Sequence, residues 1–133
     1  MTTATATRPT TPFERVGGHD TLREIVDHFY DLMDGDSAYA RLRALHAADL
    51  APMRASLAGF LAGWSGGPRD WFEANPGRCM MRAHRDVSID AVTAEQWAAA
   101  MREAVVDTIG ATDPEMAGAL SDVLERMARG MAR

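Results

Sequence analysis

The strongest constraint on the fold is a set of four apolar stripes at helical spacing, because no stretch of the chain alternates as a β-strand would. The stripes lie within residues 22–33, 50–64, 97–108 and 116–131. We expect a further short helix over 38–45 and another around residue 80 to 84. Five or six helices without a strand predict an all-α domain, in which the helices bury their stripes against one another.

Capping residues and glycines indicate where the longer helices begin and end. Thr21-Leu22-Arg23-Glu24 and Thr93-Ala94-Glu95-Gln96 both have the capping-box pattern, so we expect one helix to begin at each. Asp49 can cap the second stripe, and Gly66-Gly67-Pro68 ends it. Asp113-Pro114 combines a cap with a proline in the first turn and predicts the start of the last helix.

Length and composition predict a single folded unit. We assign residues 1–11, which are small and polar, to a disordered tail, and residues 12–133 to one domain with a core that needs no disulfide. The only cysteine, Cys79, cannot form an internal disulfide, and the sequence has no signal-peptide pattern or membrane-spanning apolar run. We therefore expect a cytoplasmic protein. Its net charge of −5 argues against nucleic acid or an anionic membrane as a partner.

Tyr30, His84 and Trp97 are candidate site residues, because each adds a polar group to an apolar helical stretch. A buried Tyr30 hydroxyl without a partner would cost about 1–3 kcal/mol, and a bound oxygen could be that partner. The alternative places Tyr30 at the edge of its helix. For His84 and Trp97 the simpler interpretation is a structural histidine and a core tryptophan, since both residue types are common at partly buried positions.

Three arginines, Arg78, Arg82 and Arg85, lie on either side of His84. They are either solvated or bind carboxylate partners, which suit the forked guanidinium donors. The sequence has no histidine pair with the spacing of a helical zinc site, no Gly-x-Ser-x-Gly elbow and no Walker-type phosphate loop. Nothing in it indicates a zinc centre, a hydrolase of that class or a nucleotide-binding protein.

Several segments, in their order and spacing, resemble the group II truncated haemoglobins. These segments are Phe13 to Gly18, Phe29-Tyr30, Leu42 to His46, Phe60 to Arg69, and His84 followed by Trp97. The resemblance covers residues 12–131. It implies a truncated globin, which is a two-over-two helical sandwich around haem b, and it places His84 on the iron as its protein ligand.

The resemblance also implies the surroundings of the haem. The residues that we expect there are His84, Tyr30, His46, Met53, Leu57, Phe60, Arg82, Trp97 and Met101. Tyr30, His46 and Trp97 would line the distal side and donate hydrogen bonds to bound ligand, with Met53 and Leu57 facing the iron. Because Met53 stands where classical globins have the distal histidine, ligand stabilisation must come from Tyr30 and Trp97. With no Cys-x-x-Cys-His motif, the haem would be held non-covalently.

Three functions are compatible with these features. The first is reversible binding of oxygen, carbon monoxide, nitric oxide or a similar small ligand by a monomer or homodimer. The second is an enzyme on the same scaffold, a nitric-oxide dioxygenase or a peroxidase-like protein, which would need a reductase or a peroxide. The third is a helical interaction module in which His84 and Trp97 belong to the core.

Overall fold

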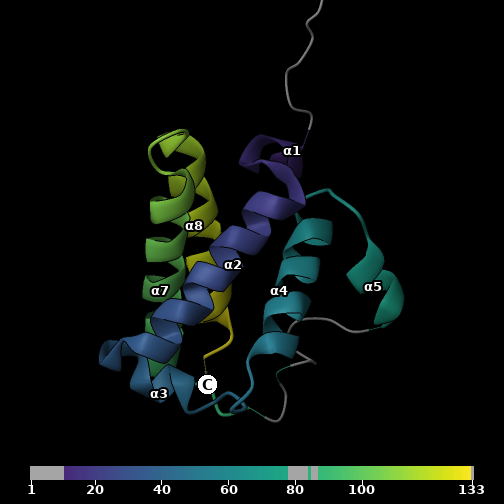
Figure 1. Cartoon of the computed structure of the whole chain (residues 1–133). Helices are drawn as coiled ribbons and strands as arrows, with labels where there is room; N and C mark the ends of the chain where they lie inside the picture. The colour runs from purple at the N-terminus through teal and green to yellow at the C-terminus, as the bar shows by residue number, and fades with distance from the viewer. Residues whose placement is uncertain (1–10, 78–83, 85–86, 133) are drawn as a thin grey trace, which may run out of the picture.

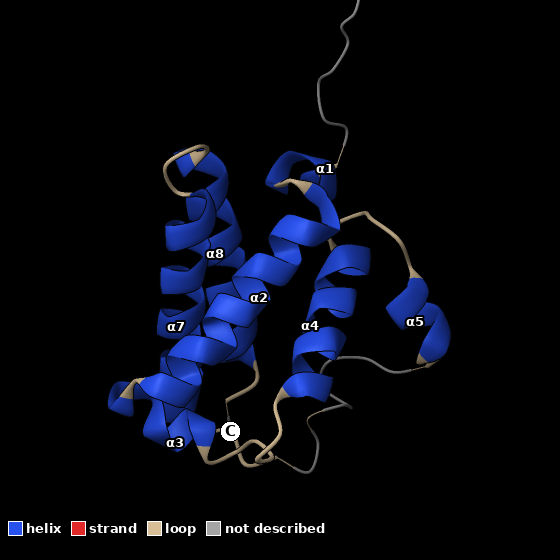
Figure 2. Ribbon diagram, in the orientation of Figure 1, coloured by secondary structure: helices blue, strands red, loops and turns tan. Residues whose placement is uncertain are grey.

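The computed structural model describes residues 11–77, 84 and 87–132, and the regular elements among them are all helices (Figure 2). In chain order they are α1 (Pro12–Val16), α2 (Gly18–Gly35), the 3-10 helix η1 (Ser37–Tyr39), α3 (Ala40–Arg43), α4 (Ala51–Trp64), α5 (Asp70–Ala74), α7 (Ala91–Ile109) and α8 (Pro114–Gly130). The all-α prediction is confirmed for this part of the chain. Most of the predicted tail, residues 1–10, lies outside it, and Thr11 forms the N-cap of α1.

Four long helices form two packed pairs. α7 lies against α8, α4 lies against α2, and α2 also crosses α7, so that α2 joins the two pairs (Figure 1). This is the two-over-two arrangement that the sequence predicts. α1 covers one end of α2, whereas α5 packs on α4 at the outside of the molecule.

The central position of α2 follows from its apolar stripe. Ile25, Val26 and Phe29 are almost completely buried, because the stripe faces both neighbouring long helices. Met101 and Val105 meet it from α7 and are equally buried. Burial of each of the larger of these side chains stabilises the fold by roughly 1.5–3 kcal/mol, so this layer is the main part of the core.

Two of the predicted helix starts are wrong. α2 begins at Gly18 and not at Thr21, because Gly17 adopts a left-handed φ of 113° that turns the chain into the helix early. The Thr21 hydroxyl donates to the Gly17 carbonyl at 3.2 Å, inside the helix. α7 begins at Ala91, since Asp90 is its cap and Thr93 is the inner partner of that capping box.

The other predicted boundaries agree with the structure. The Asp113 side chain accepts a hydrogen bond from the Met116 backbone N–H at 3.0 Å at the start of α8. Asp49 accepts from the Ala51 backbone N–H at 3.0 Å, and α4 ends at Trp64, before the paired glycines. The short helix expected over 38–45 is divided into η1 and α3. Residues 80–83 of the other expected short helix lie outside the described residues.

Glycines allow two short helices to pack closely on α4. The aromatic ring of Phe13 on α1 covers Gly67, and the Phe13 backbone N–H donates to the Ser65 carbonyl at 3.0 Å. On the other side a Cβ atom at Gly63 would lie 2.6 Å from the ring of Phe72 on α5. Both contacts need a residue without a side chain, so these glycines fix the positions of α1 and α5.

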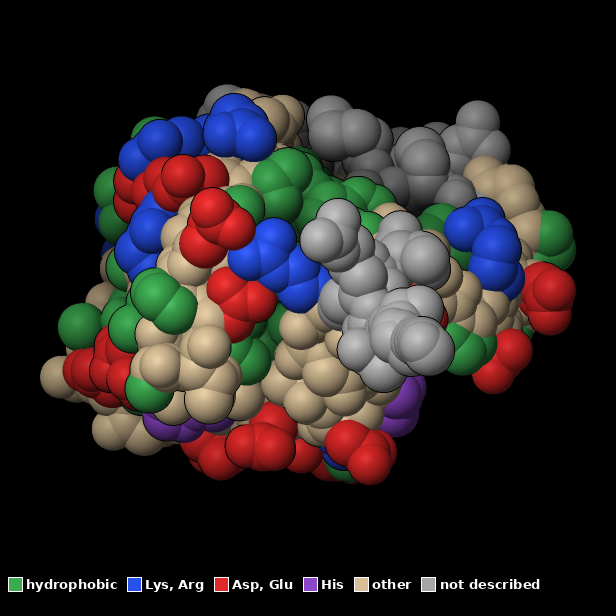
Figure 3. All heavy atoms as spheres, turned by 90° about the horizontal axis from the view of Figure 1, so that it is seen from above, with side chains coloured by type: hydrophobic (Ala, Val, Ile, Leu, Met, Phe, Trp, Pro, Cys, Tyr) green, Lys and Arg blue, Asp and Glu red, His purple; other side chains and the backbone are tan. Residues whose placement is uncertain are grey.

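The surface carries mixed charges. Acidic and basic side chains are interspersed over the face shown in Figure 3, and they do not gather there in one basic patch. Two ion pairs of Arg15 join α1 to the start of α8, with the guanidinium 2.9 Å from Asp113 and 2.8 Å from Glu115. Within the part of the chain that the structure describes, no helix is both long and apolar enough to cross a membrane.

Candidate functional site

The predicted site residues that the structure describes come from five parts of the fold. Their positions are Tyr30 on α2, His46 after α3, Met53, Leu57 and Phe60 on α4, His84 between α5 and α7, and Trp97 and Met101 on α7. Arg82 and its neighbours Arg78 and Arg85 lie outside the described residues. The site therefore depends on how the long helices cross, and no single segment forms it.

Aromatic contacts bring three of these residues together. The rings of Tyr30 and His46 meet edge to face, with their centroids 5.9 Å apart. Phe29 packs on Tyr30 at 4.9 Å and on Trp97 at 5.2 Å, in both cases edge to face. Tyr30, His46 and Trp97 thus belong to one continuous ring cluster, in which Phe29 is the link.

The Tyr30 side chain is buried, at 2% exposure, yet its hydroxyl makes no hydrogen bond to any residue that the structure describes. Burial raises the pKa of Tyr30 to about 12, against an opposing effect of the nearby Arg54 charge. The phenol is therefore neutral at physiological pH and keeps its proton. It is available as a hydrogen-bond donor to a group other than the residues that the structure describes.

The Trp97 indole N–H is likewise without an acceptor among the described residues. Other large polar side chains of the molecule do have partners there: Trp71 donates to the Ser56 hydroxyl at 2.9 Å, and Tyr39 donates to Glu103 at 3.2 Å. Neither donor is fully enclosed, because the Ser121 hydroxyl is the one buried polar side-chain atom without a partner among the described residues. The Tyr30 hydroxyl and the Trp97 indole are therefore available to a ligand with an acceptor atom.

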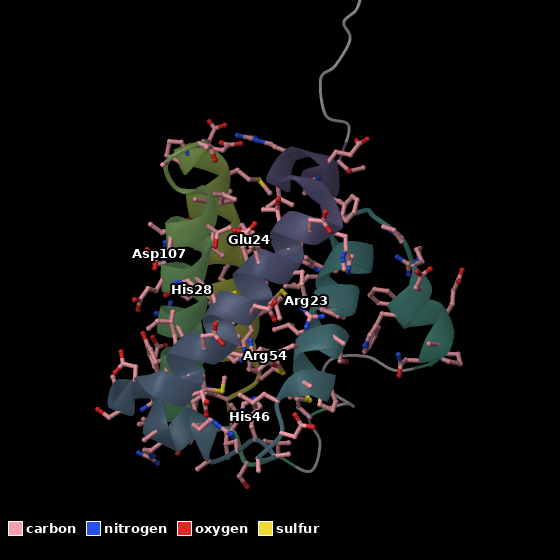
Figure 4. All side chains as sticks on the ribbon, in the orientation of Figure 1. Arg23, Glu24, His28, His46, Arg54 and Asp107 are labelled. Carbon is pink, nitrogen blue, oxygen red and sulfur yellow. The ribbon has the colours of Figure 1, made fainter. Side chains whose placement is uncertain are left out.

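His46 lies beside Tyr30 near one end of α2 and α4 (Figure 4). Its Nδ1 is 3.0 Å from the Leu42 carbonyl, so Nδ1 carries the proton in the neutral ring and Nε2 is left as an acceptor. Burial lowers the pKa of His46, and the charges of Arg43 and His84 lower it further, whereas the Leu42 hydrogen bond opposes them. Because His84 acts on His46 electrostatically, the structure places these two imidazoles in the same region.

The remaining predicted residues differ in their surroundings. Met101 is buried at 1% exposure, and Leu57 and Phe60 are half-buried against the core. The Phe60 ring also contacts Trp71 of α5, with a centroid distance of 5.4 Å. Met53 is the most open of the group, with 37% of its surface exposed.

Sequence reasoning missed Arg54. This residue of α4 donates to Asp31 at 2.7 Å and to the Asp27 carbonyl at 3.0 Å, and its guanidinium carbon lies 5.8 Å from the centre of the Tyr30 ring. Figure 4 shows Arg54 between α2 and α4. The sequence offers one signal for such a residue, since Asp27 and Asp31 lie one helical turn apart on α2, before and after Tyr30. This pair of acids predicts a basic partner nearby, but it does not identify Arg54 as that partner.

A hollow lies between α2 and α7, and Asp27 and Asp31, the partners of Arg54, belong to its lining. Its lining is mostly acidic and includes Glu24, His28 and Asp107, with His28 Nε2 2.8 Å from an Asp107 oxygen (Figure 4). The described residues contain no cluster of three or more side chains suited to hold a metal ion, here or elsewhere. The ring cluster is therefore the better candidate for the functional site.

Comparisons with known proteins agree with this geometry. The family model for bacterial-like globins matches residues 11–132. The group II 2-on-2 hemoglobin of Agrobacterium tumefaciens is 29% identical, with 97% of this chain and 98% of that chain covered at a TM-score of 0.89. The cold-adapted truncated hemoglobin of the Antarctic bacterium Pseudoalteromonas haloplanktis is 26% identical, with 93% and 98% covered at 0.88.

A thermostable hemoglobin from the actinobacterium Thermobifida fusca is 27% identical, with 93% of this chain and 98% of that chain covered at a TM-score of 0.82. No curated protein matched the chain. The family model spans nearly the whole of the described fold, and the solved structures share its two helix pairs. The chain therefore belongs to the bacterial-like globin family, as a haem-binding globin with the fold of the group II truncated haemoglobins.

Proposed function

We propose that this globin holds haem b non-covalently, with His84 as the iron ligand, and that it binds oxygen and other small diatomic ligands reversibly. The observation that carries the proposal is the Tyr30 phenol, whose ring is buried while its hydroxyl makes no hydrogen bond to the described residues. When bound, haem would supply the iron atom that binds such a ligand. The resemblance to group II haemoglobins supports the same assignment.

The polar residues of the site fit this group. Tyr30 and Trp97 each present a proton on a large ring, and both rings belong to the cluster around Phe29. A diatomic ligand that carries partial negative charge would accept hydrogen bonds from both donors. His46 contacts the edge of the Tyr30 ring and limits its movement, so the phenol is held ready for the ligand.

The apolar residues of the site perform a different task. Met101 is fully buried, and Leu57 and Phe60 are half-buried against the core, so we expect these residues of two helices to form an apolar wall of the site. Such a wall excludes water, and the exclusion strengthens each hydrogen bond to the ligand because the local dielectric constant is low. We expect His46 and Met53 to complete the distal side.

The visible absorption spectrum of the purified protein tests this function. We expect about one haem b per chain, which acidified organic solvent should extract because the sequence has no site for a thioether link. His84→Ala should lose most of its haem on gel filtration. The matched control is His28→Ala, since His28 is hydrogen-bonded to Asp107 in the acidic hollow between α2 and α7 and should leave the spectrum unchanged.

Two outcomes would contradict the proposal. Protein that is colourless and takes up no added haemin would exclude haem binding under these conditions. A His84→Ala variant with the wild-type spectrum and haem affinity would show that another residue is the iron ligand.

A further inference from the structure

Arg54 of α4 is fixed beside the Tyr30 ring by residues of α2. Its guanidinium donates to Asp31 Oδ1 at 2.7 Å, to the Asp27 carbonyl at 3.0 Å and to Asp27 Oδ1 at 3.3 Å. Only 21% of the side chain is exposed. With these bonds to two residues, the planar fork has little freedom to turn, and the charge stays 5.8 Å from the centre of the Tyr30 ring.

The positive charge of Arg54 acts on the Tyr30 ring more directly than the negative charges of its two aspartate partners do. Arg54 lies against the ring itself, whereas Asp31 is largely exposed and Asp27 is shared with a second arginine, Arg23, at 3.1 Å. Among the residues that the structure describes, the other titratable side chain in ring contact with Tyr30 is His46, in which burial lowers the pKa and so favours the neutral form. Arg54 is thus the cation nearest to the ring among the described residues.

We propose that Arg54 positions and polarises Tyr30, so that its hydroxyl becomes a stronger hydrogen-bond donor to the ligand. A cation at the ring face holds the ring through a cation–π contact. Its positive field also stabilises negative charge on the phenol oxygen, which makes the O–H group more acidic and therefore a stronger donor. The Tyr30 pKa supports the same direction, because Arg54 opposes the effect of burial there. The inference rests on the proposed function, since it assumes that Tyr30 faces the ligand.

Removing Arg54 would have two effects of the same sign. The cation–π contact disappears, and Asp31 is left as an uncompensated negative charge near the phenol, whereas Asp27 keeps only Arg23 as a partner. Both changes make the phenol less acidic and therefore a weaker donor. Removing Asp31 alone acts in the opposite direction, because Asp27 still holds the guanidinium in place.

The test uses the full chain with haem and carbon monoxide bound. The chain has two tyrosines, so Tyr39→Phe with fluorotyrosine incorporated leaves a single fluorine probe at position 30. We expect Arg54→Gln to raise the pH midpoint of this probe in fluorine NMR, Asp31→Asn to lower it, and Arg54→Lys to stay nearer to the parent. Arg23→Gln is the matched control, since it removes an arginine from Asp27 that does not lie on the ring.

Oxygen release is the second readout. Arg54→Gln should accelerate it about three- to tenfold, a fraction of the effect of losing a whole hydrogen bond to a charged acceptor. In a Tyr30→Phe background the same change should have less than about a twofold effect, because the two residues act through one hydroxyl.

The outcomes separate the inference from the function on which it rests. If Arg54→Gln moves neither readout more than Arg23→Gln does, the inference is overturned. If the probe shifts as expected but Tyr30→Phe leaves oxygen release unchanged, Arg54 does polarise Tyr30 and the ligand-binding role of Tyr30 is wrong. If Arg54→Gln does not fold, the sign of the Asp31→Asn shift decides.

Discussion

The Tyr30→Phe substitution should change the stability of this globin and its ligand affinity in opposite directions: the haem-free chain becomes slightly more stable, and bound oxygen is held less tightly. The change removes one hydroxyl and keeps the ring, so the contacts with Phe29 and His46 remain. The hydroxyl has no protein partner among the described residues, and a fully buried hydroxyl without a partner would cost about 1–3 kcal/mol. Because the Tyr30 oxygen is not among the fully buried atoms without a partner, we expect the variant's haem-free chain to gain about 1 kcal/mol in free energy of unfolding at most.

The same substitution should weaken ligand binding. A hydrogen bond to a partly charged acceptor contributes about 1.5–3 kcal/mol, which corresponds to oxygen release that is roughly ten- to a hundredfold faster. Carbon monoxide release should change less, since bound carbon monoxide carries less negative charge. Stopped-flow measurements give the release rates of oxygen and carbon monoxide, and urea unfolding of the haem-free chain gives the free energy of unfolding.

Tyr39→Phe is the matched control, because the Tyr39 hydroxyl donates to Glu103 at 3.2 Å. It should destabilise the chain slightly and leave oxygen release unaltered. Oxygen release from Tyr30→Phe within twofold of the wild-type rate would refute the reasoning. A loss of stability in the haem-free chain larger than that of Tyr39→Phe would also refute it, since it would reveal a protein partner for the Tyr30 hydroxyl.

Three further predictions concern the fold. Gly63→Ala should destabilise the protein by about 1–2 kcal/mol in urea unfolding, because the added Cβ would meet an aromatic ring of α5, whereas Gly118→Ala, with nothing within 4 Å, should stabilise it by up to about 1 kcal/mol. Ser121→Ala should raise the melting temperature, since the Ser121 hydroxyl is buried without a hydrogen bond. The hydrogen bond from Arg15 holds the pKa of Asp113 below its ordinary value of 3.8, so its stabilising effect is complete above that pH and is lost as the pH falls through the lower folded value. Asp113→Asn should therefore be less stable at neutral pH and lose less on acidification, and parallel melting curves in acid would contradict this.

The sequence by itself determined the helical content, the number of long helices and most of their boundaries. Asp113-Pro114 begins α8 as expected, because capping and proline chemistry act within a few residues and need no distant partner. Two capping patterns, in contrast, predicted the wrong first residue of a helix. Thr21 and Thr93 have capping-box sequences, yet Gly17 and Asp90 are the N-caps of those helices, since a left-handed glycine and an aspartate are the stronger signals.

The resemblance to a known family supplied the residues of the ring cluster, but their mutual contacts are a property of the tertiary structure. The edge-to-face contact between Tyr30 and His46 depends on how the segment after α3 returns toward α2. The placement of Arg54 on the Tyr30 ring depends on the crossing of α2 and α4. Helical periodicity tells which face of a helix is apolar, but the partner of each polar group on that face is chosen only when two helices pack and water is excluded between them.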